Sequence, residues 1–183
     1  MFLRCAALAL GLLAAGCATR PPPPVIDAAF EVPYTLDSGD KLRIVVFGQA
    51  SLSNTYAVDA SGRIAMPLLG MVEARGLTTA ELQRRLQAKL QQGFMRDPNV
   101  AVEVESYRPF FILGEVNQAG QYPFVSNLTV ENAVAVAGGF SPRAVKTQAV
   151  LSRTINGQIV TALVPITYPV RPGDTVNVQE RWF

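Results

Sequence analysis

The sequence contains no histidine and only two cysteines, Cys5 and Cys17, among its 183 residues. Without an imidazole, the chain cannot build the Ser-His-Asp or Cys-His arrangements of nucleophilic catalysis, and it has no histidine ligand for a metal. Because both cysteines lie in the first 17 residues, the rest of the chain has no thiol, disulfide or thiolate metal site. These absences argue against an enzyme, and we expect no catalytic residue, metal or cofactor.

The sequence also lacks a large excess of either positive or negative charge. Lys and Arg together number 16 against 14 Asp and Glu, a net charge of +2, and the basic residues are scattered along the chain. A nucleic-acid interface needs a concentrated basic surface, so we expect no nucleic-acid partner. Apolar residues make up 49% of the sequence, which is enough for one sizeable domain or two small ones.

The N-terminal residues have the features of an export signal. Arg4 supplies a positive charge, residues 5–15 form an apolar run, and small residues follow at 14–16. The apolar run is too short to cross a bilayer as a helix. Four prolines at 21–24 then favour an extended polyproline II conformation. The pattern predicts a signal peptide over residues 1–16 and a stiff spacer over residues 17–33.

The junction Gly16-Cys17 resembles the lipobox of bacterial lipoproteins. This resemblance implies that the chain is cleaved between Gly16 and Cys17 and that the Cys17 thiol carries lipid. The alternative is an ordinary secretory signal that happens to contain a cysteine. Ala18, rather than the Asp that marks inner-membrane retention in enteric-type lipoproteins, follows the cysteine. The resemblance therefore implies an anchor in the outer membrane.

A turn and a strand open the first predicted module. Gly39 can adopt a positive φ, and the Asp40 carboxylate can accept hydrogen bonds from nearby backbone amides. The strand that follows alternates apolar and polar residues. Its apolar positions are Leu42, Ile44 and Val46.

A helix is predicted over residues 77–93, after two short strands that read as a hairpin. Thr78 and Glu81 have the spacing of a capping box, and Gly93 provides a stop. A solvated polar face is expected opposite its apolar face, and another alternating strand follows at residues 100–104. The apolar positions of the helix are Leu82, Leu86 and Leu90.

The second half of the chain repeats parts of this plan. A strand is predicted over residues 110–116, and a short helix ends at Gly138-Gly139. The segment "RPGDTVNV" parallels "DSGDKLRI", which places Gly173 and Asp174 in a turn equivalent to the first one. We predict an α+β fold of two small modules, residues 34–106 and 107–183, with short mixed or antiparallel strands and one helix each.

The carboxylates near turns are candidates for the catalytic pair of a glycosidase. Such an enzyme needs two carboxylates that face each other across a sugar. The spacing of Asp37, Asp40, Asp59 and Asp174 gives no reason to pair any two of them. Asp beside Gly and Ser is the usual composition of turns, so we expect structural roles.

The segments "YTLDSGDKLRIVVFGQ", "VDASGRIAMPLLGMVEARGLTTAEL" and "DPNVAVEV" resemble the polysaccharide export domain of outer-membrane polysaccharide export proteins of the Wza and GumB type. "RPFFILGEVNQAGQYPF" followed by "LTVENAVAVAGGF" is similar to the β-grasp-like SLBB domain that follows it in that family. With one SLBB-like module and no stretch after Asp174 long enough to span a membrane as a helix, the sequence resembles the short, GumB-like form.

The resemblance implies a lipoprotein that forms a homo-oligomeric ring and conducts capsular polysaccharide or exopolysaccharide through the periplasm and outer membrane. Its implied partner is an inner-membrane polysaccharide co-polymerase of the Wzc and GumC kind. The alternative is a monomeric, periplasm-facing lipoprotein that binds glycan or acts as a scaffold. Trp182 and Phe183 either dock onto a neighbour or the membrane interface, or close the last module.

Overall fold

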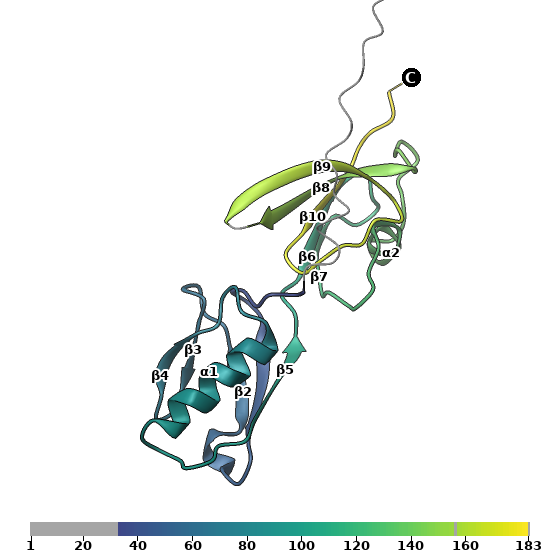
Figure 1. Ribbon diagram of the computed structural model, residues 1–183. Helices are drawn as coiled ribbons and strands as arrows, with labels where there is room; N and C mark the ends of the chain where they lie inside the picture. Colours follow the sequence, from purple (N-terminus) through teal and green to yellow (C-terminus); the bar gives the residue numbers. More distant parts are fainter. Residues whose placement is uncertain (1–32, 156, 183) are drawn as a thin grey trace, which may run out of the picture.

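The computed structural model describes residues 33–155 and 157–182, which form two modules with separate hydrophobic cores. Figure 1 shows the modules as two lobes joined by the chain that leaves the first sheet. Each module has strands and one α-helix, so the predicted α+β fold is confirmed. The predictions for Gly16 and Cys17 fall outside the described residues.

The first module is built around β1 (Lys41–Val46), the central strand of an antiparallel sheet of order β2-β1-β5. Its apolar positions are buried, as the alternation predicts, and its polar positions are exposed. The neighbouring strands are β2 (Asn54–Ala57) and β5 (Val100–Ser106), with the short 3-10 helix η2 (Ala50–Leu52) before β2. The predicted hairpin is β3 (Arg63–Met66) and β4 (Gly70–Glu73).

Helix α1 (Thr79–Gln91) covers one face of the first module (Figure 1). Its capping box is present, because the Thr78 side chain accepts from the Glu81 amide and the Glu81 carboxylate accepts from the Thr78 amide. Leucines four residues apart fall on one face of a helix, where they bury against the sheet. Leu82, Leu86 and Leu90 are all fully buried.

The second module contains a five-stranded mixed sheet of order β7-β6-β10-β8-β9. Strands β6 and β10 are parallel, and the other pairs are antiparallel. Helix α2 (Val130–Val136) buries three small apolar residues against this module. The strands are β6 (Phe110–Gly114), β7 (Gly120–Tyr122), β8 (Gln148–Ile155), β9 (Gln158–Pro165) and β10 (Thr175–Val178).

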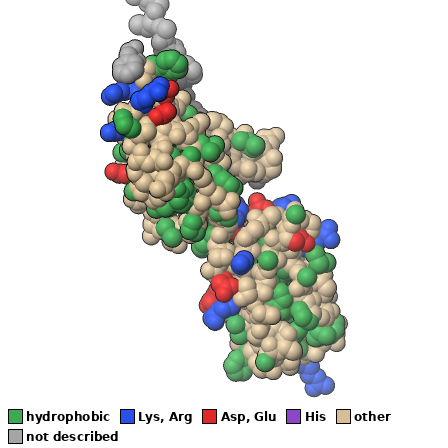
Figure 2. All heavy atoms as spheres, turned by 180° about the vertical axis from the view of Figure 1, so that it is seen from behind, with side chains coloured by type: hydrophobic (Ala, Val, Ile, Leu, Met, Phe, Trp, Pro, Cys, Tyr) green, Lys and Arg blue, Asp and Glu red, His purple; other side chains and the backbone are tan. Residues whose placement is uncertain are grey.

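The long hairpin of β8 and β9 was not predicted from the sequence. The inward positions of β8 are Ala149, Leu151 and Arg153, and the arginine interrupts what would otherwise be an apolar row. The Asn156-Gly157 dipeptide is a strong hairpin signal in the sequence that could have revealed it. The hairpin projects from the second lobe in both overall views (Figures 1 and 2).

Trp182 is 90% exposed, so of the two alternatives given for it, the one in which it closes the last module is wrong. Phe183 lies outside the described residues. No helix within residues 33–155 and 157–182 is long and apolar enough to cross a membrane.

Candidate functional site at the joint between the modules

A seven-residue turn motif occurs twice, and each copy leads into the strand at the centre of one module. The copies are "YTLDSGD", residues 34–40, before β1, and "YPVRPGD", residues 168–174, before β10. The glycine of each copy has a positive φ, 94° at Gly39 and 84° at Gly173. Residues with a Cβ atom rarely adopt this backbone conformation. Both carboxylates are buried, with Asp40 fully inaccessible and Asp174 1% exposed.

The Asp40 carboxylate is held by hydrogen bonds from both sides of the joint. It accepts from the Tyr34 hydroxyl at 2.6 Å and from the Asp37 amide at 2.9 Å. The Arg108 amide donates to its other oxygen at 2.9 Å, and the Arg108 guanidinium approaches to 3.3 Å. The same guanidinium lies over the Tyr34 ring, 5.5 Å from its centre.

Asp174 is likewise held by an arginine and a turn amide, here within the second module. It accepts two hydrogen bonds from the Arg153 guanidinium, at 2.9 and 2.7 Å, and one from the Arg171 amide at 2.7 Å. The Arg153 guanidinium also lies over the Tyr168 ring, 5.8 Å from its centre. Such a fork-shaped pair satisfies a buried carboxylate, which is then poorly placed to transfer protons to a substrate. Both aspartates therefore serve the turns in this structure.

The arginines of these two sets were missed by sequence reasoning. Arg108 is 68 residues from Asp40, and Arg153 is 21 residues from Asp174, so spacing along the chain does not pair them. One signal was available, because a tyrosine stands six residues before the aspartate in both copies. That repeat marks the whole turn as a unit rather than Gly and Asp alone.

Arg108 lies in the connection between the modules and contacts both turns. A Cβ atom placed on Gly173 would lie only 2.7 Å from Arg108 Nε, so the glycine leaves room for this side chain. The Gly173 amide donates to the Pro109 carbonyl at 3.0 Å, next along the connection. The joint is therefore packed and hydrogen-bonded on both sides.

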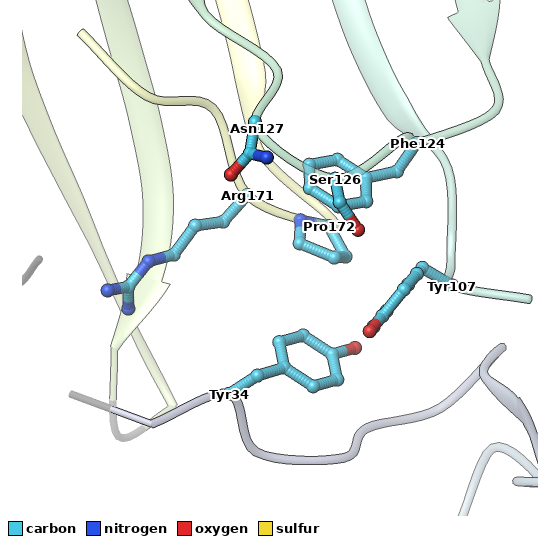
Figure 3. A pocket seen from close by; sticks show the side chains of 7 residues that line it. All are labelled: Tyr34, Tyr107, Phe124, Ser126, Asn127, Arg171 and Pro172. Carbon is cyan, nitrogen blue, oxygen red and sulfur yellow. The ribbon is translucent and has the colours of Figure 1, made fainter. Parts of the chain in front are cut away.

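A pocket of about 220 Å³ opens beside this joint (Figure 3). Tyr107 stands between two other rings, with its centre 5.0 Å from Tyr34 and 5.5 Å from Phe124. Both contacts are edge-to-face, at 86° and 78°, the arrangement that aromatic quadrupoles favour. The pocket is lined by Tyr34, Tyr107, Phe124, Ser126, Asn127, Arg171 and Pro172.

The ionisable groups of the pocket are the phenols of Tyr34 and Tyr107 and the guanidinium of Arg171. Burial, together with the hydrogen bond to Asp40, raises the pKa of Tyr34 well above its ordinary value, so its hydroxyl stays protonated. Burial and the nearby Arg153 charge lower the pKa of Arg171, although a guanidinium remains charged near neutral pH. The pocket thus combines aromatic surface with one cation.

The structure thus defines a class of protein with two tandem α+β modules, buried carboxylates that hold the turns, and an aromatic pocket at the joint. Residues 29–105 match the family model of polysaccharide biosynthesis/export proteins, and residues 109–161 match the SLBB domain. The Arg108 joint lies between the two matched segments. The chain belongs to the polysaccharide export proteins.

Curated relatives share this region of the chain. The exopolysaccharide production protein ExoF of Rhizobium meliloti (strain 1021) is 37% identical over 118 residues, 58% of this chain and 28% of ExoF. The polysialic acid transport protein KpsD of Escherichia coli is 25% identical over 115 residues, 62% of this chain and 21% of KpsD. The EPS I polysaccharide export outer membrane protein EpsA of Ralstonia nicotianae (strain ATCC BAA-1114 / GMI1000) is 27% identical over 135 residues, 60% of this chain and 35% of EpsA. The chain thus matches about a fifth to a third of each relative's length.

Proposed function

We propose that this chain is an oligomeric lipoprotein of the outer membrane that helps to conduct capsular polysaccharide or exopolysaccharide from the periplasm to the cell surface. The observation that carries the proposal is the order of the two modules, an export domain followed directly by an SLBB domain. The names of the relatives refer to polysaccharide production, transport and export, which supports the same role.

The proposed attachment to the membrane is a lipid on Cys17, after cleavage between Gly16 and Cys17. Residues 17–33 would then hold the two modules, residues 34–106 and 107–183, away from the bilayer on its periplasmic side. In this position the protein would meet an inner-membrane polysaccharide co-polymerase across the periplasm.

Self-association is supported by the outward face of the second sheet. The pairing register places Leu113, Asn177, Val150 and Leu163 in one row across four strands, and facing residues in a register share one side of a sheet. Leu163 and Leu113 are 49% and 47% exposed, and Ile159 further along the edge strand is 76% exposed. An apolar sheet face ending in an edge strand is suited to contact with a second copy of the chain.

The lipid anchor and the assembly can be tested in one experiment. Cys17→Ala and a matched control, Cys5→Ala, are expressed in cells that lack the native protein. We expect the control to fractionate with the outer membrane and to restore export, because Cys5 is removed with the signal peptide. Cys17→Ala should remain soluble in the periplasm and export less polymer. Unchanged membrane fractionation of Cys17→Ala would exclude the anchor.

The anchored protein is then extracted in mild detergent and its mass is measured by native mass spectrometry, with and without the co-polymerase. A discrete closed oligomer is expected, since a conduit requires a symmetric ring. A monomer under both conditions would instead favour a glycan-binding or scaffold lipoprotein.

A further inference from the structure

The pocket of about 220 Å³ is assembled from both modules. Tyr34 comes from the turn before β1, Tyr107 from the connection, and the other lining residues from the second module. Figure 3 shows these side chains gathered around one hollow. The pocket therefore exists only while the joint holds the modules in this arrangement, and the Arg108 contacts described above hold that joint.

The aromatic side of the pocket offers a surface for apolar ring faces. Phe124 and Tyr107 are half-buried, so part of each ring remains accessible. The Tyr34 ring, held by the Arg108 guanidinium, also lines the pocket beside these two rings. The C–H faces of a pyranose ring carry slight positive charge and pack well on the negative faces of aromatic rings.

The pocket also has polar lining residues. Ser126 and Asn127 are exposed on the loop between β7 and α2, and they offer a hydroxyl and an amide that can both donate and accept. Asn127 has a positive φ of 63°, an uncommon conformation for a residue other than glycine. Sugar hydroxyls, which also donate and accept, match these groups.

The charge and the size of the pocket narrow the class of ligand. Arg171 is the charged group among its lining residues, and none of them is acidic. A guanidinium pairs with a carboxylate through two parallel hydrogen bonds. The volume is below the roughly 300–1,000 Å³ of sites for drug-sized ligands, so the pocket suits a single ring.

We propose that the pocket at the joint binds one uronic-acid ring of an acidic polysaccharide, with the ring face on the aromatic side and the carboxylate at Arg171. This inference rests on the proposed export function and names the polymer class that the chain handles. A single-ring site binds weakly, which suits a conduit, because a transported molecule must leave its site as readily as it enters.

Two hexasaccharides provide a matched pair of probes: β-1,4-linked glucuronic acid and cellohexaose. They share ring and linkage and differ at C6, a carboxylate in one and a hydroxymethyl group in the other. Binding to the detergent-solubilised full mature chain is measured by titration calorimetry. We expect the acidic hexamer to bind about tenfold more tightly at low salt, the scale of a charge-assisted contact, and the difference to shrink at high salt.

Two variants separate the parts of the site. Arg171→Gln should lower affinity for the acidic hexamer about tenfold and leave cellohexaose unchanged. Phe124→Leu keeps an apolar side chain but removes a ring, so it should weaken both hexamers by a similar factor. Arg143→Gln, an exposed arginine of the same module, is the control and should change neither. Unchanged melting temperatures establish that the variants are folded.

Three results would each overturn the pocket assignment. They are equal affinity of the two hexamers, no binding of either hexamer at millimolar concentration, and an Arg171→Gln variant that still prefers the acidic hexamer. These results are independent of the membrane anchor. If Cys17→Ala loses export while neither hexamer binds, the export function stands and the pocket assignment fails. If the acidic hexamer binds while Cys17→Ala still fractionates with the membrane and exports polymer, the pocket stands and the anchor fails.

Discussion

Replacing Arg153 by methionine should strongly destabilise the second module. The Arg153 side chain is 9% exposed and that of Asp174 is 1% exposed, and they share two hydrogen bonds of 2.9 and 2.7 Å. Burial by itself would lower the pKa of Arg153, but Asp174 raises it above its ordinary value, so the charged form is held in place. Methionine fills similar space but leaves the Asp174 charge without its cation.

The size of the effect follows from the burial of the pair. Removing one partner of a buried ion pair costs about 3–5 kcal/mol, because the remaining charge is left in a poorly solvated site. A module of this size loses about 4–8 °C in melting temperature per kcal/mol. A cost of about 3 kcal/mol at about 4 °C per kcal/mol lowers the melting temperature by at least about 12 °C.

Differential scanning calorimetry of the full chain measures the melting of both modules. Arg143→Met is the matched control, because Arg143 pairs with Glu180 on the surface with 65% of its side chain exposed. An exposed pair contributes at most about 1 kcal/mol. Adding Asp174→Asn to Arg153→Met should recover part of the loss by removing the stranded charge. If Arg153→Met melts within about 2 °C of Arg143→Met, the buried pair does not hold this module.

Two further predictions concern the turns. Gly173→Ala should lower the melting temperature more than Gly48→Ala does. Both glycines have a positive φ, but an added Cβ would lie 2.7 Å from Arg108 Nε at Gly173 and would meet no atom within 4 Å at Gly48. Equal melting temperatures of the two variants would refute the close approach. For Asp37, burial opposes ionisation, but a backbone amide and the Arg75 guanidinium hold the pKa of its carboxyl below the ordinary value. The contribution of ionised Asp37 to the free energy of unfolding is therefore present above the unfolded pKa of about 3.9, and it is lost as pH falls through the folded pKa. Urea unfolding should show Asp37→Asn less stable than the native chain at neutral pH, with the gap closing in acid; a gap independent of pH would contradict this.

Local patterns in the sequence were sufficient for much of the fold. The alternation in β1, the leucine spacing of α1 and the Thr78-Glu81 capping box depend on residues a few positions apart. Their geometry follows from the backbone periods of strand and helix, which hold in any tertiary context. The fold class and the family resemblance rest on these same local segments.

The candidate site depended on contacts between distant segments. Burying Asp40 and Asp174 requires a cation for each, and only the packed chain brings Arg108 and Arg153 to them. The same packing sets Tyr34 beside Tyr107 and opens the pocket at the joint. The sequence by itself determined the turns, the main helix and the class of fold, because those are decided within a few residues. The tertiary structure decided which charges pair and where a ligand can enter, because desolvated partners are chosen by three-dimensional proximity and not by spacing along the chain.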